Sequence, residues 1–355
     1  MKIVNARSFA RAGFLGNPSD GYFGKTVSFT FNRFCVDLKL MESERLAFTP
    51  GQVDDASFAN PRDLVRDLRL YGYYGGIRML KAVSKLFFEY CFDHGIELEA
   101  VNFTASYKIN IPRLVGLSGS SAICSAMLKA LMEFYGVEIP LEVCPTICLE
   151  AERDELGIAC GLQDRVIQMY NGMVYMDFER TLVESTGHGR YERLAPPPLN
   201  LYVAFDPNRA EESGKAHRKV KRLFQEKNRD VMSAMDEFAD IAREGRDILA
   251  DPEACSGAAG RKRLAELVNA NFDLRDRVFN VASENRNMVM VARAAGASAK
   301  FAGSGGAIVG TYEDDGQFAL LKERLAAIGC TTFRPVIATA ADERAEITAN
   351  GWRTS

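Results

Sequence analysis

The sequence predicts an α+β protein with two domains. Its 355 residues, 47% of them hydrophobic, are enough to bury more than one core. Strand-like and helix-like segments are mixed along the chain, without the strict alternation that parallel strands with crossover helices require. The proline-rich stretch "LAPPPLN", Leu194 to Asn200, is the best candidate for a linker, because long helices dominate the pattern beyond it. We therefore expect domains at residues 1–193 and 200–355.

In the first domain, runs of β-branched and aromatic residues predict strands, and apolar residues at helical spacing predict helices. We expect two of the helices to end at Gly95 and Gly136, because glycine readily caps a helix C-terminus. Pro145 is tolerated in the first turn of another. The expected elements are strands at 1–13 and 25–31, a helix at 75–95, a strand at 98–110, helices at 123–136, 144–157 and 165–172, and a strand at 173–178.

In the second domain, the sequence predicts two long helices, roughly Glu212–Leu249 and Arg261–Ala295. A strand, a glycine-rich loop and a second strand follow in "AKFAGSGGAIVG", residues 299–310. A helix and a last strand at 331–338 complete the expected order.

Composition excludes several classes of function. The formal net charge of −3 gives no bias toward nucleic acid or an anionic membrane. The N-terminus carries charges where a signal peptide needs an apolar segment, and no apolar run approaches the ~20 residues that span a bilayer. The eight cysteines are scattered without a CxxC pair, which favours buried thiols in a reducing compartment. We expect a cytoplasmic protein without nucleic-acid or membrane partners.

The stretch "PRLVGLSGSSAICSA", Pro112 to Ala126, places glycines and serines directly before a helix. Such a loop can be a simple turn, or it can cradle phosphate, because its backbone N–H groups and the helix dipole both favour an anion. It lacks the lysine of a Walker A loop and the spacing of a dinucleotide-binding GxGxxG loop. The residues of this loop alone leave both readings open.

Two acidic residues follow this helix, Glu152 and Asp164. Acids on helices are usually solvated, and this is the simplest reading of Glu152 taken alone. Asp164 follows a glycine turn and begins a helix, where the dipole keeps a carboxylate ionised. Such a carboxylate can either accept a proton or orient a nucleophile.

Three stretches resemble the motifs of the GHMP family of small-molecule kinases. The loop resembles the second motif, usually written PxxxGLxSSA, with one extra residue between Leu117 and the paired serines. "ARAGFLGNPSDGYFG" resembles the first motif, with Arg11 as its basic residue and Asp20 at the place of a sugar-binding aspartate in galactokinase-like members. "KFAGSGGAIVG" resembles the third motif, a glycine-rich loop. The motifs occur in the family's order and reach from Arg11 to Gly310.

The resemblance implies a fold and a set of roles. The fold is the two-domain GHMP kinase fold with ATP in the cleft between domains, and the cofactors are ATP and Mg²⁺. The spacing of Glu152 and Asp164 also matches galactokinase-like kinases, which implies that the first holds magnesium with Ser121 and the second engages the acceptor hydroxyl. Arg11 would offset charge on the transferred group. The implied ATP-binding residues are Pro112, Gly116, Leu117, Ser118, Gly119, Ser120, Ser121 and Ala122.

On the substrate side, the resemblance implies that Asp20 fixes sugar hydroxyls and that Gly303, Ser304, Gly305 and Gly306 close the site. Phrases such as "GNPSDGYFGKTVSFT" and "GLQDRVIQMYNGMVYMDF" resemble the plant-type glucuronokinases within the family. This implies a sugar acid as substrate, phosphorylated at its anomeric hydroxyl. A substrate carboxylate needs cationic donors, and Arg165 and Arg113 are the candidates.

Two alternatives remain open. The chain could phosphorylate another sugar or small alcohol, or it could bind a sugar or nucleotide without turnover, as a sensor. The presence of Arg11, Glu152 and Asp164 argues against the sensor, because a pure binder has no evident use for that set. A panel of sugars would distinguish the two kinases.

Overall fold

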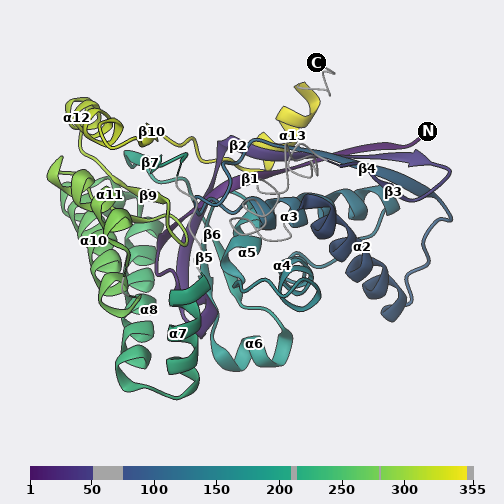
Figure 1. Ribbon diagram of the computed structural model, residues 1–355, viewed down its shortest axis with the longest axis horizontal. Helices are drawn as coiled ribbons and strands as arrows, with labels where there is room; N and C mark the ends of the chain where they lie inside the picture. Colours follow the sequence, from purple (N-terminus) through teal and green to yellow (C-terminus); the bar gives the residue numbers. More distant parts are fainter. Residues whose placement is uncertain (51–74, 209–213, 280, 350–355) are drawn as a thin grey trace, which may run out of the picture.

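The computed structural model describes residues 1–50, 75–208, 214–279 and 281–349. Two sheets with helices packed against them form the fold (Figure 1). The first sheet has the order β3-β4-β2-β5-β6, with β1 also paired to β2. Its strands are β1 (Ile3–Leu15), β2 (Lys25–Ser43), β3 (Ala47–Phe48), β4 (Asn102–Ile109), β5 (Met173–Asp177) and β6 (Arg190–Leu194).

Strand β1 is buried along almost its whole length, because helices cover the sheet from both sides. Helix α3 packs against β1 and β2, whereas from the second half of the chain α8 contacts both strands and α10 contacts β1 (Figure 1). Arg11 lies opposite Thr30 of β2, and the register shifts on either side of it, at Phe9/Ala10 and Gly13/Leu15. The strand thus carries a polar side chain into a buried space between the two halves.

The helices of the first half follow the expected order, with one addition. They are α2 (Gly76–Asp93), α3 (Gly119–Tyr135), α4 (Cys144–Glu150), α5 (Gln163–Tyr170) and the unexpected α6 (Arg180–Thr186). A short 3-10 turn spans Ser19–Tyr22, and a π-helical segment, Ala151–Glu155, continues α4. Gly136 caps α3 with φ of 65°, as its position predicts.

The second sheet has the order β10-β7-β9-β8, from β7 (Leu201–Phe205), β8 (Lys300–Phe301), β9 (Ala307–Thr311) and β10 (Thr331–Phe333). Strand β7 follows the proline-rich stretch directly and was not expected. The helices are α7 (Gly214–Gln225), α8 (Arg229–Ala250), α9 (Pro252–Ser256), α10 (Ala258–Phe279), α11 (Ser283–Ala294), α12 (Asp315–Ala326) and α13 (Ala340–Ala349).

The two long helices of the sequence prediction are each divided. The first is interrupted before α8, where Lys227 adopts a φ of 54° and the Asn228 side chain accepts from the N–H of Val231. Its predicted start at Glu212 lies outside the described residues. The second ends as α10 at Phe279 and resumes as α11.

The end of the described chain returns to the first sheet. Ile337 forms a bridge with Phe31, and Ala338 exchanges backbone hydrogen bonds of 2.7–2.9 Å with Thr30 and Gly172. Glu343 of α13 accepts from Lys129 of α3 at 2.9 and 3.0 Å. The domain boundary at 193/200 stays a prediction, and this segment contacts the first half from beyond it.

Candidate active site

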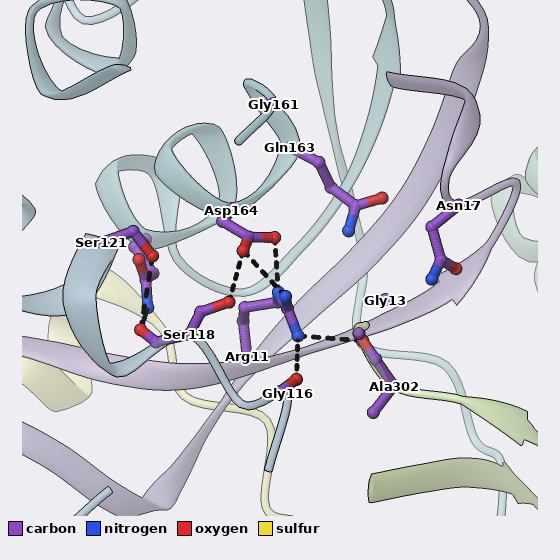
Figure 2. Close-up of polar contacts among 12 residues, drawn as sticks. Arg11, Gly13, Asn17, Gly116, Ser118, Ser121, Gly161, Gln163, Asp164 and Ala302 are labelled. Atoms are coloured by element: carbon purple, nitrogen blue, oxygen red, sulfur yellow. Dashed lines mark hydrogen bonds and ion pairs between the residues drawn. The ribbon is translucent and has the colours of Figure 1, made fainter. Parts of the chain in front are cut away.

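One buried arginine joins the three predicted motif regions. The Arg11 side chain is 4% exposed, and its Nε and Nη2 donate to the two carboxylate oxygens of Asp164 at 2.6 and 2.8 Å. Its Nη1 donates to the carbonyl oxygens of Gly116 at 2.7 Å and Ala302 at 2.9 Å (Figure 2). A single guanidinium thus binds the helix α5 carboxylate, the loop before α3 and the loop between β8 and β9. This bidentate geometry is the strong form of an arginine–carboxylate pair.

The loop before α3 has the backbone of a tight anion-binding turn. Gly116 and Ser118 adopt positive φ values of 74° and 62°, and α3 begins at Gly119. The first N–H groups of a helix have no acceptor within the helix, so they are available to an anion at this end of α3. Ser118 Oγ donates to Asp164 Oδ2 at 2.5 Å. The loop and the α5 carboxylate therefore face one another.

The two glycine loops touch, and glycine is required where they do. A Cβ at Gly303 would lie 2.2 Å from the carbonyl oxygen of Gly116 and 2.9 Å from Arg11 Nη1. A Cβ at Gly116 would lie 2.5 Å from the carbonyl oxygen of Gly305. On the other side, Arg275 of α10 donates to the carbonyls of Gly303 and Ser304 at 2.8 and 3.0 Å. The loop that was expected to close the site is held against the loop that was expected to hold ATP.

Glu152 and Arg165 form a fully buried ion pair. Glu152 is 0% exposed, and its Oε2 accepts from Arg165 Nε at 2.9 Å and from Nη2. Arg165 Nη1 donates to the carbonyl of Gly161 at 2.8 Å. Burial opposes charge on Arg165, but Glu152 beside it raises the pKa of the guanidinium. The N–H groups of Arg165 therefore bind Glu152 and Gly161 inside the protein and point away from the role of binding a substrate carboxylate that the sequence predicts for it.

Glu152 retains one oxygen for another ligand. Its Oε1 is buried and has no hydrogen-bond partner among the described residues. A buried carboxylate oxygen without a donor is costly, and a cation would remove that cost. Ser121, the other predicted magnesium ligand, is 1% exposed, and its Oγ makes only a 3.3 Å bond to the carbonyl of Ser118. These groups fit a magnesium ion that takes its remaining ligands from water and phosphate.

Asp164 and Asp20 have pKa values displaced in opposite directions. Burial alone would raise the pKa of Asp164, but the charge and hydrogen bonds of Arg11, followed by Arg165 and Ser118, lower it to about 2. The pKa of Asp20 is raised to about 6, first by burial and then by the Asp164 charge. Two carboxylates whose environments separate their pKa values in this way commonly have different roles in one site.

The remaining predicted residues lie around this centre or apart from it. Asp20 Oδ2 accepts from the backbone N–H of Gln163 at 3.3 Å, at the start of α5. Within the loop, Leu117 and Ala122 are buried apolar supports, whereas Pro112 and Ser120 are half-buried. Arg113 is exposed.

Four polar residues of the site were missed by sequence reasoning. Asn17 and Gln163 lie inside quoted stretches, so "GNPSDG" and "GLQD" could have suggested them. Lys300 opens the quoted stretch "KFAGSGGAIVG", but Arg275 carries no local signal, since a single cation in a helix is common. Among the described ranges, no three His, Cys, Asp or Glu side chains are grouped to hold a metal, and no helix is long and apolar enough to cross a membrane.

Comparisons with known proteins agree with the geometry. Residues 78–172 match the family "GHMP kinases N terminal domain". Glucuronokinase 1 of Arabidopsis thaliana is 44% identical over 338 residues, covering 92% of this chain and 90% of its own length. Probable glucuronokinase 2 of the same plant is 46% identical over 317 residues, covering 86% and 84%.

Solved structures share the fold at low sequence identity. Lactococcus lactis galactokinase complexed with galactose superposes with a TM-score of 0.73 at 12% identity, covering 95% of this chain and 94% of that one. Streptococcus pneumoniae phosphomevalonate kinase superposes with a TM-score of 0.70 at 12% identity, covering 95% of this chain and 100% of that one. The α+β arrangement described above is thus the GHMP kinase fold.

Proposed function

The chain belongs to the glucuronokinase family of GHMP kinases, and from this membership we infer that it transfers the γ-phosphoryl group of ATP to the anomeric hydroxyl of D-glucuronate. The products are ADP and glucuronate 1-phosphate. The geometric observation that carries this inference is the Arg11 guanidinium, which binds Asp164 and both glycine loops at once.

The protein's part in phosphoryl transfer is mainly positioning and charge stabilisation. The N–H groups at the start of α3, Gly119 to Ser121, hold the ATP phosphates. Arg11 lies between the two loops, where its charge offsets the negative charge that develops on the transferred group. Gly303 to Gly306 form the opposite wall and exclude water when both substrates are bound.

Magnesium would be held by Glu152 Oε1 and Ser121, together with phosphate oxygens and water. When bound, it neutralises phosphate charge and fixes the orientation of the γ-phosphate. The hydrogen bonds from Arg165 Nε and Nη2 to Glu152 Oε2 limit the rotation of that carboxylate and leave Oε1 on the other side.

Asp164 orients the acceptor. A pKa of about 2 makes its carboxylate a poor proton acceptor, because an efficient general base has a pKa near the working pH. An ionised carboxylate still accepts a hydrogen bond from the sugar's 1-hydroxyl and directs the hydroxyl oxygen toward the phosphorus. Asp20, on the same side of the site, accepts from other sugar hydroxyls.

The alternatives are not favoured. Identity of 44–46% over most of the chain points to the glucuronokinases and away from kinases of unrelated acceptors. A sensor would not need the Arg11–Asp164 pair at the contact of two glycine loops. A cytoplasmic location remains our proposal, and it fits eight cysteines that are all unpaired.

A substrate panel tests the function. We measure kcat/KM for D-glucuronate, D-galacturonate and D-glucose at saturating magnesium-ATP. Sites built to bind a polar group reject an analogue without it by about 10⁴–10⁵-fold. We expect glucuronate to exceed glucose by at least ~10³-fold, allowing for water in the lost contact, with galacturonate between them. Equal values for glucose and glucuronate would reject the assignment and leave a sugar kinase of the same fold.

A further inference from the structure

Two buried amide side chains face an empty side of the backbone at Gly13. Asn17 and Gln163 are 3% and 4% exposed, and both point into the space beside Gly13 (Figure 2). A Cβ at Gly13 would lie 3.0 Å from Asn17 Cγ and 3.0 Å from Gln163 Nε2. The glycine therefore leaves room where any other residue would meet both amides.

The Gln163 amide has no partner in the part of the chain that the structure describes. Its Oε1 is buried without a hydrogen bond, and its Nε2, the donor, lies 3.0 Å from the position of a Cβ at Gly13 and donates to none of the described residues. Burying an amide without partners is costly, so such a group at the edge of an active site marks a place for a ligand. Its neighbour in sequence, Asp164, engages the reacting hydroxyl in the proposed function.

A buried lysine fixes the orientation of Asn17. Lys300 is 1% exposed, and its Nζ donates to Asn17 Oδ1 and to the carbonyls of Gly13 at 2.7 Å and Phe301 at 2.9 Å. An ammonium only donates, so the Asn17 oxygen faces Lys300 and its NH₂ group faces away from it. Figure 2 shows this nitrogen on the side of Gly13. The lysine thus presents an N–H donor to the space beside Gly13.

The charge around this space favours an anion. All three acceptors of Lys300 are neutral oxygens, so no described carboxylate neutralises it. Burial, followed by Arg275 and Arg11, lowers the pKa of Lys300 well below its ordinary value, yet three acceptors around one nitrogen are the pattern of an ammonium. The nearby acid Asp164 already pairs with Arg11, and the carboxylate of Asp20 accepts from the backbone N–H of Gln163. A bound anion would relieve the buried positive charge.

We propose that Asn17 and Gln163, with Lys300 behind Asn17, form the subsite that binds the carboxylate of the sugar acid. This inference rests on the proposed function and replaces Arg165 and Arg113 as the specificity-determining residues. Arg165 is bound to Glu152, and Arg113 is exposed. Recognition by amide donors in a positive field explains how the site holds a carboxylate without an arginine of its own.

Isosteric acids test the subsite. Asn17→Asp keeps the shape and the contact with Lys300 but replaces the inward NH₂ by a carboxylate oxygen, and Gln163→Glu makes the same change on α5. We expect each to lower kcat/KM for D-glucuronate by at least ~10²-fold while changing that for D-glucose by less than ~3-fold, since only glucuronate brings a second anion. Calorimetric titration with each sugar, without ATP, checks that the loss is in binding.

The control variant is Asn271→Asp. Asn271 binds the N–H of Gly16 at 2.6 Å and the carbonyl of Asn17 at 3.0 Å, so it supports the same loop from behind. Asn271→Asp should lower kcat/KM for D-glucuronate and for D-glucose by similar factors. If Asn17→Asp and Gln163→Glu lower kcat/KM for both sugars by similar factors, the proposed subsite is wrong.

Loss of folding does not remove the test. If thermal melts show that Asn17→Asp is unfolded, Gln163→Glu and the uncharged Gln163→Met decide. Gln163→Glu should lower kcat/KM for D-glucuronate more than Gln163→Met does. Equal losses in the two variants reject the inference. A wild type that does not prefer glucuronate would instead reject the proposed function, so the two failures are distinguishable.

Discussion

Replacing Asp164 by asparagine separates its contribution to catalysis from its contribution to stability. The change keeps the size of the side chain but removes the charge opposite Arg11. Lowering the pKa of Asp164 from an ordinary 3.8 to about 2 corresponds to about 2 kcal/mol of folding free energy near neutral pH. A protein with about 5–15 kcal/mol of stability remains folded after this loss, and its Tm falls by about 5 °C or less. By contrast, kcat should fall at least ~10²-fold, because the acceptor hydroxyl loses its orienting carboxylate.

The pH dependence of this stability has a definite sign. A carboxylate whose pKa is depressed by folding stabilises the protein above its unfolded pKa, about 3.9, and loses that contribution as the pH falls toward about 2. The difference in unfolding free energy between wild type and Asp164→Asn should be constant from about pH 5 to 8 and shrink between about pH 4 and pH 2. Denaturant titrations across this pH range measure the difference in unfolding free energy, and steady-state kinetics at about pH 7.5 measure kcat.

Asp177→Asn is the matched control. Asp177 pairs with Lys25 across β2 and β5, with side chains 21% and 22% exposed. Asp177→Asn should lower the free energy of unfolding by less than about 1 kcal/mol and leave kcat unchanged. If Asp164→Asn retains more than a tenth of the wild-type kcat, Asp164 does not act on the reacting hydroxyl. If its stability deficit persists at pH 2, Arg11 does not hold the carboxylate ionised.

Three further variants extend the reasoning. Glu152→Gln should raise the magnesium concentration for half-maximal rate at least ~5-fold and lower Tm, because it leaves Arg165 buried without its charge partner. Asp20→Asn should be more stable than wild type at pH 8, because the wild-type carboxylate, with a pKa of about 6, is ionised there at a cost in folding free energy. This gain in stability should disappear below about pH 4, where the carboxyl group is protonated in both the folded and the unfolded protein. The variant should also bind the sugar less tightly. Gly303→Ala should raise the KM for ATP at least ~10-fold, because its Cβ separates the loop from Gly116.

Controls for these variants lie outside the site. Glu155→Gln removes a half-exposed partner of Lys85, so its magnesium titration should match wild type. Gly316→Ala places a methyl group 3.3 Å from Asp314 Oδ1, far from both loops, and should not change the KM for ATP. An unchanged magnesium titration in Glu152→Gln excludes that residue from the metal site. An Asp20→Asn protein less stable than wild type at pH 8 contradicts the raised pKa.

Gly119→Val is a weak test of the loop before α3. The position of Gly119 at the start of α3 predicts that a side chain there obstructs a bound phosphate. In the structure, a Cβ at Gly119 lies 3.4 Å from Ile109 Cδ1 and 3.8 Å from Ile111, on the apolar side of the loop. The extra methyl groups of valine would press on the β4 end and disturb folding. Gly303, whose Cβ meets the phosphate loop itself, is the better position.

Local signals predicted the elements that depend on neighbouring residues. Helix α3 and its Gly136 cap were predicted because apolar spacing and a left-handed glycine are both visible in a short window. Strand β7 was missed because "LYVAF" is buried at all five positions and therefore shows no alternation. The break before α8 was missed because it uses Lys227 and Asn228 in place of glycine or proline.

The site was predictable only in part for a similar reason. Arg11 and Asp164 each stood in a recognisable motif, but their ion pair joins residues 153 positions apart, which no local pattern specifies. Lys300 was missed because its function depends on Asn17, 283 positions away. The ion pair of Arg165 with Glu152 was not foreseen, since a cation next to a predicted catalytic acid can turn either toward substrate or toward the core, and only packing decides.

The return of residues 336–343 to the first sheet affects how this chain can fold during synthesis. When the N-terminal half leaves the ribosome, Thr30 and Gly172 have no partners for the bonds that Ala338 later supplies, and Lys129 lacks Glu343. Thr30 ends in a buried position and Gly172 and Lys129 end half-buried, so water must serve these groups until the segment after β10 has been made. A nascent chain stalled after β10 should therefore be more sensitive to protease in its first half than the released protein. Residues 336–343 therefore stabilise strand β2, which is made much earlier, only once translation has passed β10.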